Sequence, residues 1–445
     1  MRKLRVVAAA AVAVVASLCL VPAASPAETT PSAVAMCTSL LAPVMGGAVP
    51  SSEPLAPCQW DMLQIHATTG GSYAVATGRG VRVGVIDGGV DMTHPDIAPN
   101  LNVALSCSFI FSTTPTADPQ EVGNGDCTNK AAVQDLGGHG THVASTIAAP
   151  VNGIGIAGVA PQATIVAIKA CTIASYCFAD SVAAALRYAG DLRLDVVNLS
   201  LFADPYLYLC GNDAEQRAIY QDLQDAARYA QQRGVVIVAA AGNESQDLQH
   251  PDQDVISPDW PPGAAVTREV GNNCRVTPAE IPGVLAVSSV GPFGIADYSN
   301  TGMGVVGVAA PGGDYFQGLD VVQTGVLAAG SSTDNDPDLG IWPFLDFLND
   351  NAFPGLTVLD HGARYDVLTG TSMASPHAAG VAALVRQMHP GWSPGAVIAA
   401  VERSAQPRSC PAADGFTTAV PCQGQGGRTS YFGHGLVDAL AAART

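Results

Sequence analysis

The stretch VRVGVID, residues 81–87, is followed by Gly88 and Gly89. An apolar run of this length that leads an aspartate into a glycine turn predicts a strand buried on both faces of a sheet. The alternation continues along the chain, with strands expected at 163–170, 195–201, 235–242, 283–291 and 305–312 and helices at 142–149, 180–190 and 213–234. Buried strands separated by helices predict an α/β fold of three layers, in which a mostly parallel, twisted sheet carries helices on both faces.

The composition of the whole chain agrees with such a fold. Of its 445 residues, 48% are hydrophobic and only 13% are charged, which is typical of a globular protein with a large core. The formal net charge is −18. We therefore expect no nucleic-acid partner, because binding to phosphate backbones depends on basic residues.

The N-terminus has the pattern of a secretory signal peptide over residues 1–27. A basic start precedes an apolar run from Val6 to Val21, and small residues surround Ala27. An uncleaved membrane anchor is the alternative, although the run is short for a bilayer span. The protein is thus expected to be secreted and extracellular, with no membrane association after cleavage.

The rest of the chain is expected to form one main domain behind a short lead-in. Residues 28–57 are rich in Pro, Ser and Ala and predict little regular structure. Residues 58–445 are expected to form the main domain. The acidic segment at about 313–363 is interpreted as an insertion into that domain.

Ten cysteines remain once Cys19 of the signal peptide is set aside. An even number in an exported protein predicts disulfides, although the sequence alone leaves their connectivity open. Metal binding is the weaker alternative, because no CxxC spacing occurs. We expect sequential neighbours to pair, as Cys37–Cys58, Cys107–Cys127, Cys171–Cys177, Cys210–Cys274 and Cys410–Cys422.

Four polar residues stand where strands end or helices begin. Asp87 ends the first strand, His139 follows two glycines in GGHGTHVAS, and Ser372 opens the helix of GTSMASPH. Asn243 follows a strand in AAAGNES. An acid that orients an imidazole, an imidazole that takes a serine proton, and an amide that stabilises the oxyanion together perform acyl transfer.

These motifs carry a resemblance to a known family. VIDGGVDMTHPDI, GGHGTHVAS, DVVNLSL, AAAGNES and GTSMASPHAAGVAAL resemble the subtilisin family of serine endopeptidases, from about Gln59 to Ala439. The resemblance implies hydrolysis of peptide bonds in protein or peptide substrates through an acyl-enzyme, without a catalytic cofactor, by a monomer. It makes Asp87 the orienting acid, His139 the general base, Ser372 the nucleophile and Asn243 the oxyanion donor.

The resemblance also implies a structural calcium site. Asp96 matches a calcium ligand of many family members, and the loop PVNGIGI, residues 150–156, is similar to theirs in length. Its ligands would be the side chains of Asp96 and Asn152 and the carbonyls of Ile154 and Ile156. Oxygen ligands of this kind suit calcium. A loop without a metal is the alternative.

The substrate-binding residues implied by the family are Ser200, Leu201, Phe202 and Gly242. Phe202 stands where many relatives have a glycine in the primary specificity pocket. We therefore expect the pocket to be narrowed or reshaped, so the family's preference for large apolar P1 residues does not carry over. The lead-in is also shorter than the family's usual inhibitory propeptide.

Two rival functions belong to other classes. An α/β-hydrolase esterase would use Ser372, Asp414 and His434 in that order, but Ala374 replaces the second glycine of its motif. A catalytically silent binding protein would keep the subtilisin fold without activity. The second rival would be favoured if Phe202 blocked the cleft.

Overall fold

The computed structural model describes residues 35, 38–39, 41, 45–314, 324–332, 357–411, 419–425 and 427–445. The predicted signal peptide, Cys37 and Asp414 therefore lie outside the described residues, as does most of the predicted insertion. Within the described residues, no helix is both long and apolar enough to cross a bilayer.

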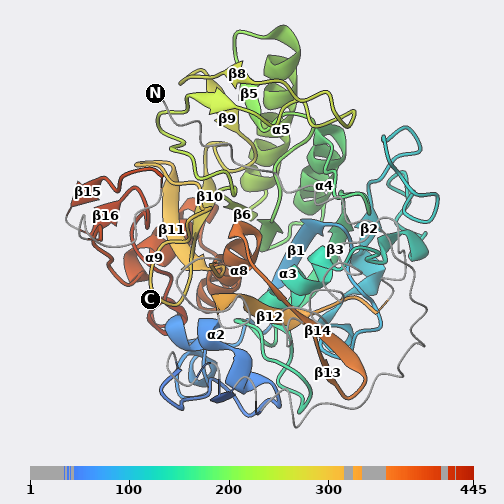
Figure 1. Cartoon of the computed structure of the whole chain (residues 1–445). Coiled ribbons are helices and arrows are strands. Elements are labelled where there is room, and N and C mark those ends of the chain that lie inside the picture. The colour runs from blue at the N-terminus through green and yellow to red at the C-terminus, as the bar shows by residue number, and fades with distance from the viewer. Residues whose placement is uncertain are drawn as a thin grey trace, which may run out of the picture.

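A seven-stranded sheet forms the centre of the molecule (Figure 1). Its strand order is β11-β10-β6-β4-β1-β3-β2, and every neighbouring pair is parallel. The strands are β1 (Arg82–Asp87), β2 (Cys107–Ser108), β3 (Thr164–Lys169), β4 (Val196–Leu199), β6 (Val236–Ala240), β10 (Val284–Val290) and β11 (Val306–Pro311). The six strands expected from the sequence are all present in this sheet.

Helices cover both faces of the sheet, which confirms the predicted three-layer α/β fold. Alternate residues of β3 point to opposite sides, so that Ile165 joins one hydrophobic core and Val166 the other. One core is shared by α3 and α8, and the other by α4 and α5. The helices are α2 (Trp60–Gln64), α3 (His139–Ala148), α4 (Ala179–Asp191), α5 (Ala214–Gln232), α8 (Thr371–Met388), α9 (Pro394–Ser404) and α10 (Ala439–Ala443).

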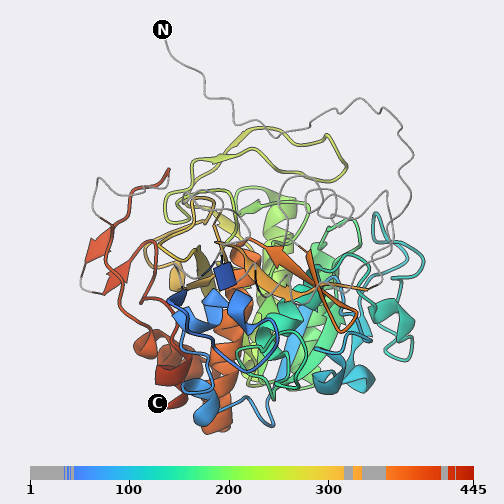
Figure 2. The ribbon, with the colours of Figure 1, turned by 60° about the horizontal axis from the view of Figure 1, so that its bottom comes forward.

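Four smaller sheets lie outside the central one. In the largest of them, β14 (Ala363–Leu368) pairs with β12 (Val326–Ala329) and β13 (Thr357–Asp360), both antiparallel. Figure 2 shows these strands, in orange, beside α3. The other sheets pair β5 (Tyr208–Cys210) with β9 (Cys274–Val276), β7 (Gln253–Asp254) with β8 (Arg268–Glu269), and β15 (Gly424–Gln425) with β16 (Arg428–Thr429).

Four of the five predicted disulfides are formed. They join Cys107 to Cys127, Cys171 to Cys177, Cys210 to Cys274, and Cys410 to Cys422. Cys58 is also disulfide-bonded, and its predicted partner Cys37 lies outside the described residues.

Candidate active site

The carboxyl ends of β1, β4 and β6 open into one cleft, as expected for a parallel sheet. Asp87 is the last residue of β1, and Asn243 follows β6. The helices contribute their first turns, since His139 begins α3 and Ser372 is the second residue of α8. All four residues line the same cavity, whose volume is about 230 Å³. The structure thus brings together the four residues that the sequence singled out.

Asp87 and His139 form a hydrogen-bonded pair in the cleft. His139 Nδ1 lies 2.8 Å from Asp87 Oδ1 and 3.0 Å from Oδ2. Asp87 also accepts a hydrogen bond from the backbone N–H of Gly88 (2.7 Å), and its side chain is only 3% exposed. The imidazole is 40% exposed and lines the cleft. The carboxylate therefore fixes the ring and leaves its Nε2 atom facing the cavity side of the pair.

Opposing effects set the pKa of His139. Burial lowers it, but the charge and hydrogen bond of Asp87 and the charge of Asp135 outweigh burial, so the pKa lies above its usual value. The imidazolium form is thereby stabilised. This suits a group that takes up a proton during a reaction and releases it again.

Asp135 holds the start of α3 and was not singled out from the sequence. Its carboxylate accepts hydrogen bonds from the backbone N–H groups of Gly137 (3.0 Å), Gly138 (2.8 Å) and Thr141 (2.8 Å). Gly138 has a φ of 82° and sits just before the helix. The first N–H groups of a helix need acceptors outside the helix. An aspartate three residues before GHG was therefore the sequence signal for this role.

Ser372 lies in the first turn of α8, where backbone N–H groups have no partner within the helix. Its hydroxyl donates to the carbonyl of Ser200 (3.2 Å). The hydroxyl of Ser200 in turn donates to the carbonyl of Ser372 (2.8 Å). Among the hydrogen bonds of the described residues, none joins the Ser372 hydroxyl to His139. The two residues line the same cleft.

Asn243 is positioned by the residue before Ser372. Its Oδ1 atom accepts hydrogen bonds from the backbone N–H (2.9 Å) and the hydroxyl (2.8 Å) of Thr371. Because the amide oxygen is engaged, the orientation of the amide group is fixed and its Nδ2 donor is left for the cleft. The side chain is exposed on the cleft side. Asn243 is therefore a donor held beside the first turn of α8.

Two glycines are required by the close packing around these residues. A Cβ atom on Gly140 would lie 2.1 Å from the carbonyl oxygen of Gly89 and 3.1 Å from Asp87 Oδ1. Gly242 has a φ of +104°, and a Cβ atom there would lie 2.4 Å from Asn300 Nδ2. The glycines in GGHGTH and AAAGNES thus allow the Asp87–His139 pair and Asn243 to approach their supports.

The predicted substrate-binding residues also line the cavity, and the structure adds others. Ser200, Leu201, Phe202 and Gly242 are all part of its wall. Residues that sequence reasoning missed include Asp204, Glu244, Val276 and the disulfide-bonded pair Cys171 and Cys177. Glu244 directly follows Asn243, so its position in the chain was a signal. No sequence signal marked Val276, because it belongs to β9, which pairs with the distant strand β5.

The residues of the predicted calcium site meet elsewhere, next to the β13–β14 hairpin. Asp96 Oδ1 accepts a hydrogen bond from Asn152 Nδ2 (3.0 Å), and Oδ2 accepts from the Ile156 N–H (3.0 Å) and the Tyr365 hydroxyl (2.8 Å). The Asn152 oxygen accepts from the Ile154 N–H (2.9 Å). The loop therefore presents N–H donors, not carbonyl oxygens, to Asp96. This arrangement does not suit a cation.

The residues of the esterase hypothesis do not meet in the described part of the chain. His434 does not line the cavity of Ser372 and lies 3.8 Å from Glu402. Asp414 lies outside the described residues. The cavity instead contains His139 and Asp87.

Comparisons with known proteins agree with this geometry. A model of the subtilase family matches residues 78–435. Subtilisin Savinase of Lederbergia lenta is 30% identical over 385 residues, which cover 86% of this chain and 98% of that protein. Subtilisin E of Bacillus subtilis (strain 168) is 29% identical over 369 residues, which cover 83% of this chain and 67% of that protein.

A solved protease structure is also similar to this chain. The structure of a protease from Pseudoalteromonas arctica has a TM-score of 0.60 and 26% sequence identity, and the match covers 89% of this chain and 99% of that one. The family match spans the sheet and the cleft described above. The chain belongs to the subtilase family and is a serine-type endopeptidase.

Proposed function

We propose that the protein cleaves peptide bonds through an acyl-enzyme on Ser372. The observation that carries this proposal is the Asp87–His139 pair, which lines one cleft with a serine at a helix N-terminus. Asp87 accepts from His139 Nδ1–H, so that Nε2 is the basic nitrogen. His139 is then the general base, and Asn243 Nδ2 and the Ser372 N–H are the oxyanion donors.

The reaction follows from these positions. His139 Nε2 takes the hydroxyl proton as Ser372 Oγ bonds to the substrate carbonyl carbon. The carbonyl oxygen becomes an oxyanion beside Asn243. The C–N bond then breaks as His139 returns the proton to the leaving amine, and water repeats the sequence to release the acid. Catalytic hydrogen bonds often tighten only after substrate binds, so the bond from the Ser372 hydroxyl to the Ser200 carbonyl in the free protein agrees with this role.

Export is part of the same proposal. The signal-like sequence of residues 1–27 and the disulfides support an extracellular enzyme, because disulfides persist in oxidising compartments. Its substrates are then extracellular proteins or peptides, and it acts as a monomer.

Covalent labelling tests the proposed nucleophile. A fluorophosphonate is expected to form one adduct on the folded protein, on Ser372, because only a serine with a general base attacks phosphorus readily. The adduct is mapped by mass spectrometry. Prior replacement of His139 by alanine should prevent labelling, and heat-denatured protein is the control. Labelling that persists without His139 would favour the esterase order, and folded protein without an adduct would favour a silent binding protein.

We also propose that the loop at 152–157 is held without calcium. Besides the bonds to Asp96, the N–H of Gly153 donates to Glu53 (2.8 Å) and the N–H of Gly155 donates to Asp360 (2.7 Å). Protein carboxylates thus accept the N–H groups of a loop that would have to turn its carbonyls inward to bind a cation.

Removal of divalent cations is therefore expected to leave the thermal midpoint unchanged. The reason is that protein carboxylates already accept the N–H groups that hold the loop, so a chelator removes no stabilising bond. Differential scanning calorimetry with EDTA, and again with added calcium chloride, measures the midpoint. A midpoint that falls with EDTA and recovers with calcium would contradict the proposal and restore the calcium site expected from the sequence.

A further inference from the structure

We propose that Phe202 and Val276 close the end of the substrate pocket, so that the enzyme prefers a small, uncharged P1 residue such as alanine. The disulfide between Cys210 and Cys274 holds this closure in place. The inference rests on the proposed function, because P1 is defined by attack from Ser372. It assigns substrate preference to residues of this chain that lie far apart in the sequence.

The position of the P1 side chain follows from the site. A substrate carbonyl at Ser372 with its oxygen toward Asn243 lies against this cavity, which is lined by residues at and after the ends of β4 and β6, so we place the P1 side chain there. These segments provide Leu201 and Phe202 on one side and Ala240 and Glu244 on the other. Val276, from β9, lines the same cavity. The size of this space decides which P1 side chains fit.

Phe202 and Val276 are joined in one apolar cluster. Val276 is 2% exposed and belongs to a buried group that also contains Tyr208, Cys210 and Cys274, and Phe202 packs against this group. The N–H of Ala203 donates to the carbonyl of Thr277 (3.0 Å), which ties the two segments together directly beside these side chains. A benzyl and an isopropyl group are therefore held together in the wall of the pocket, where close packing resists expansion.

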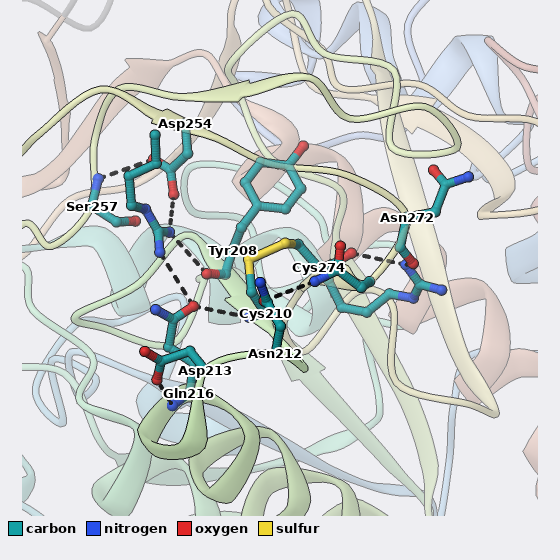
Figure 3. The surroundings of a disulfide bond; sticks show 12 residues. Tyr208, Cys210, Asn212, Asp213, Gln216, Asp254, Ser257, Asn272 and Cys274 are labelled. Carbon is teal, nitrogen blue, oxygen red and sulfur yellow. Dashed lines mark hydrogen bonds and ion pairs between the residues drawn. A yellow bond between two sulfur atoms is a disulfide. The ribbon is translucent and has the colours of Figure 1, made fainter.

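The β5–β9 pair keeps Val276 in that position. In its register, Tyr208 lies opposite Val276 and Cys210 opposite Cys274, so the disulfide crosslinks the pair two residues from Val276. Figure 3 shows the disulfide with the polar residues around it. Gln216, in the first turn of α5, accepts from the Cys210 N–H (2.9 Å).

A buried ion pair fixes the other side of this β5–β9 pair. Arg268 pairs with Asp254, which is fully buried, and also donates to the carbonyl of Tyr208 (3.0 Å). The Tyr208 hydroxyl donates to Gln246 Oε1 (2.5 Å). The wall of the pocket is thus held by a covalent bond, by a charge pair and by hydrogen bonds, and it cannot open without breaking several of them.

The acids of the cleft wall do not favour a basic P1 residue. Glu244 accepts from Asn300 Nδ2 (2.5 Å) and from backbone N–H groups, and burial raises the pKa of its carboxyl group. Burial, followed by the hydrogen bond and charge of Asp259, raises the pKa of Asp204. Glu244 is engaged by Asn300, and Asp204 accepts a hydrogen bond from the N–H of Cys177, so neither carboxyl group offers a free charge to lysine or arginine.

Kinetics with tetrapeptide p-nitroanilides that differ only in P1 test the inference. For the wild-type enzyme, kcat/KM for alanine is expected to exceed that for phenylalanine by at least about 10-fold, since pocket fit discriminates by roughly 10–200-fold. In Phe202→Gly, kcat/KM for phenylalanine at P1 should rise by about 10- to 100-fold while that for alanine changes little. Val276→Gly should act in the same direction.

Controls separate the pocket from effects on folding. Phe293→Gly removes a phenyl ring that is 61% exposed outside the cavity, and it should leave the P1 ratio unchanged. If Phe202→Gly does not fold, Phe202→Leu tests the same wall with a smaller loss of volume. Replacing both Cys210 and Cys274 with serine should broaden P1 preference toward larger residues, because the crosslink of the wall is lost.

The outcomes distinguish this inference from the proposed function. A wild-type enzyme that prefers phenylalanine, or lysine, at P1 while Ser372 is labelled by the fluorophosphonate would overturn the inference alone. A P1 ratio that stays the same in Phe202→Gly, Phe202→Leu and Val276→Gly would also overturn it. If Ser372 is not labelled and no peptide is cleaved, the proposed function fails and the inference fails with it.

Discussion

Replacement of Ser372 by alanine is expected to lower kcat by about 10⁵- to 10⁶-fold, a range based on the nucleophile of a relative in this family. Without the hydroxyl no acyl-enzyme can form, and His139 has no proton to take. Residual hydrolysis above the rate in water would come from Asn243 and the bound geometry, which remain. Steady-state kinetics on the preferred peptide, corrected by active-site titration, measure the loss.

The fold should survive this substitution. Within the described residues, the serine hydroxyl donates one hydrogen bond, to the Ser200 carbonyl, and a single hydrogen bond contributes roughly 0.5–1.5 kcal/mol to the free energy of unfolding. Ser375→Ala is the matched control, because Ser375 Oγ lies 2.8 Å from the hydroxyl of the same Ser200. That variant should keep most of the activity. A Ser372→Ala enzyme with activity near the wild type would show that another group is the nucleophile.

The fold was predictable because its strands are buried on both faces. Runs such as 235–242 are apolar throughout, and the structure places β6 within that run. The start of α3 was set three residues too late, at 142 instead of His139. The helix begins at His139 because Gly138 adopts a left-handed conformation and the Asp135 carboxylate accepts N–H groups at the helix start. The effect of these two residues depends on tertiary contacts that a local sequence pattern does not contain.

The small sheet of β12, β13 and β14 was not predicted. Its strands are short, and β12 pairs with β14 across some thirty intervening residues, so no local signal marks the pairing. Both β12 and β13 lie within the segment interpreted as an insertion, 313–363. This sheet carries Tyr365 and Asp360 to the loop at 152–157. The carboxylates that accept the N–H groups of that loop come from distant parts of the chain, so no local pattern reveals them.

The candidate site could be predicted where chemistry and local conformation coincide. Asp87, His139, Asn243 and Ser372 each stand at the end of a strand or the start of a helix, and parallel topology brings such positions together. Val276 could not be found in this way. It reaches the cleft through the β5–β9 pairing, which joins strands far apart in the sequence, so no local pattern marks it as part of the cleft wall.

Replacement of Asp87 by asparagine is expected to lower kcat by about 10⁴-fold at neutral pH, although the residue never touches the substrate. The Asp87 carboxylate can accept hydrogen bonds but cannot donate them, so it holds the proton on His139 Nδ1 and leaves Nε2 basic. An amide can donate to Nδ1 instead, which stabilises the tautomer that carries its proton on Nε2. In that tautomer the imidazole cannot accept the proton of Ser372.

The pH profile should change as well as the rate. Activity requires neutral His139, so kcat/KM of the wild-type enzyme is lost as the pH falls through the raised pKa of this group. Since Asp87 raises that pKa, its loss lets burial dominate, and the acidic limb should move to lower pH. Profiles of kcat/KM from acidic to alkaline pH measure the shift.

Asp180→Asn makes the same chemical change on the surface, in the first turn of α4, and should alter neither the rate nor the profile. The fold of Asp87→Asn should be retained, because the asparagine oxygen can still accept the hydrogen bond from Gly88. A profile that keeps its acidic limb while the rate falls would mean that Asp87 orients His139 without setting its proton affinity. An unchanged rate would mean that another acceptor fixes the imidazole and that Asp87 has no part in the reaction.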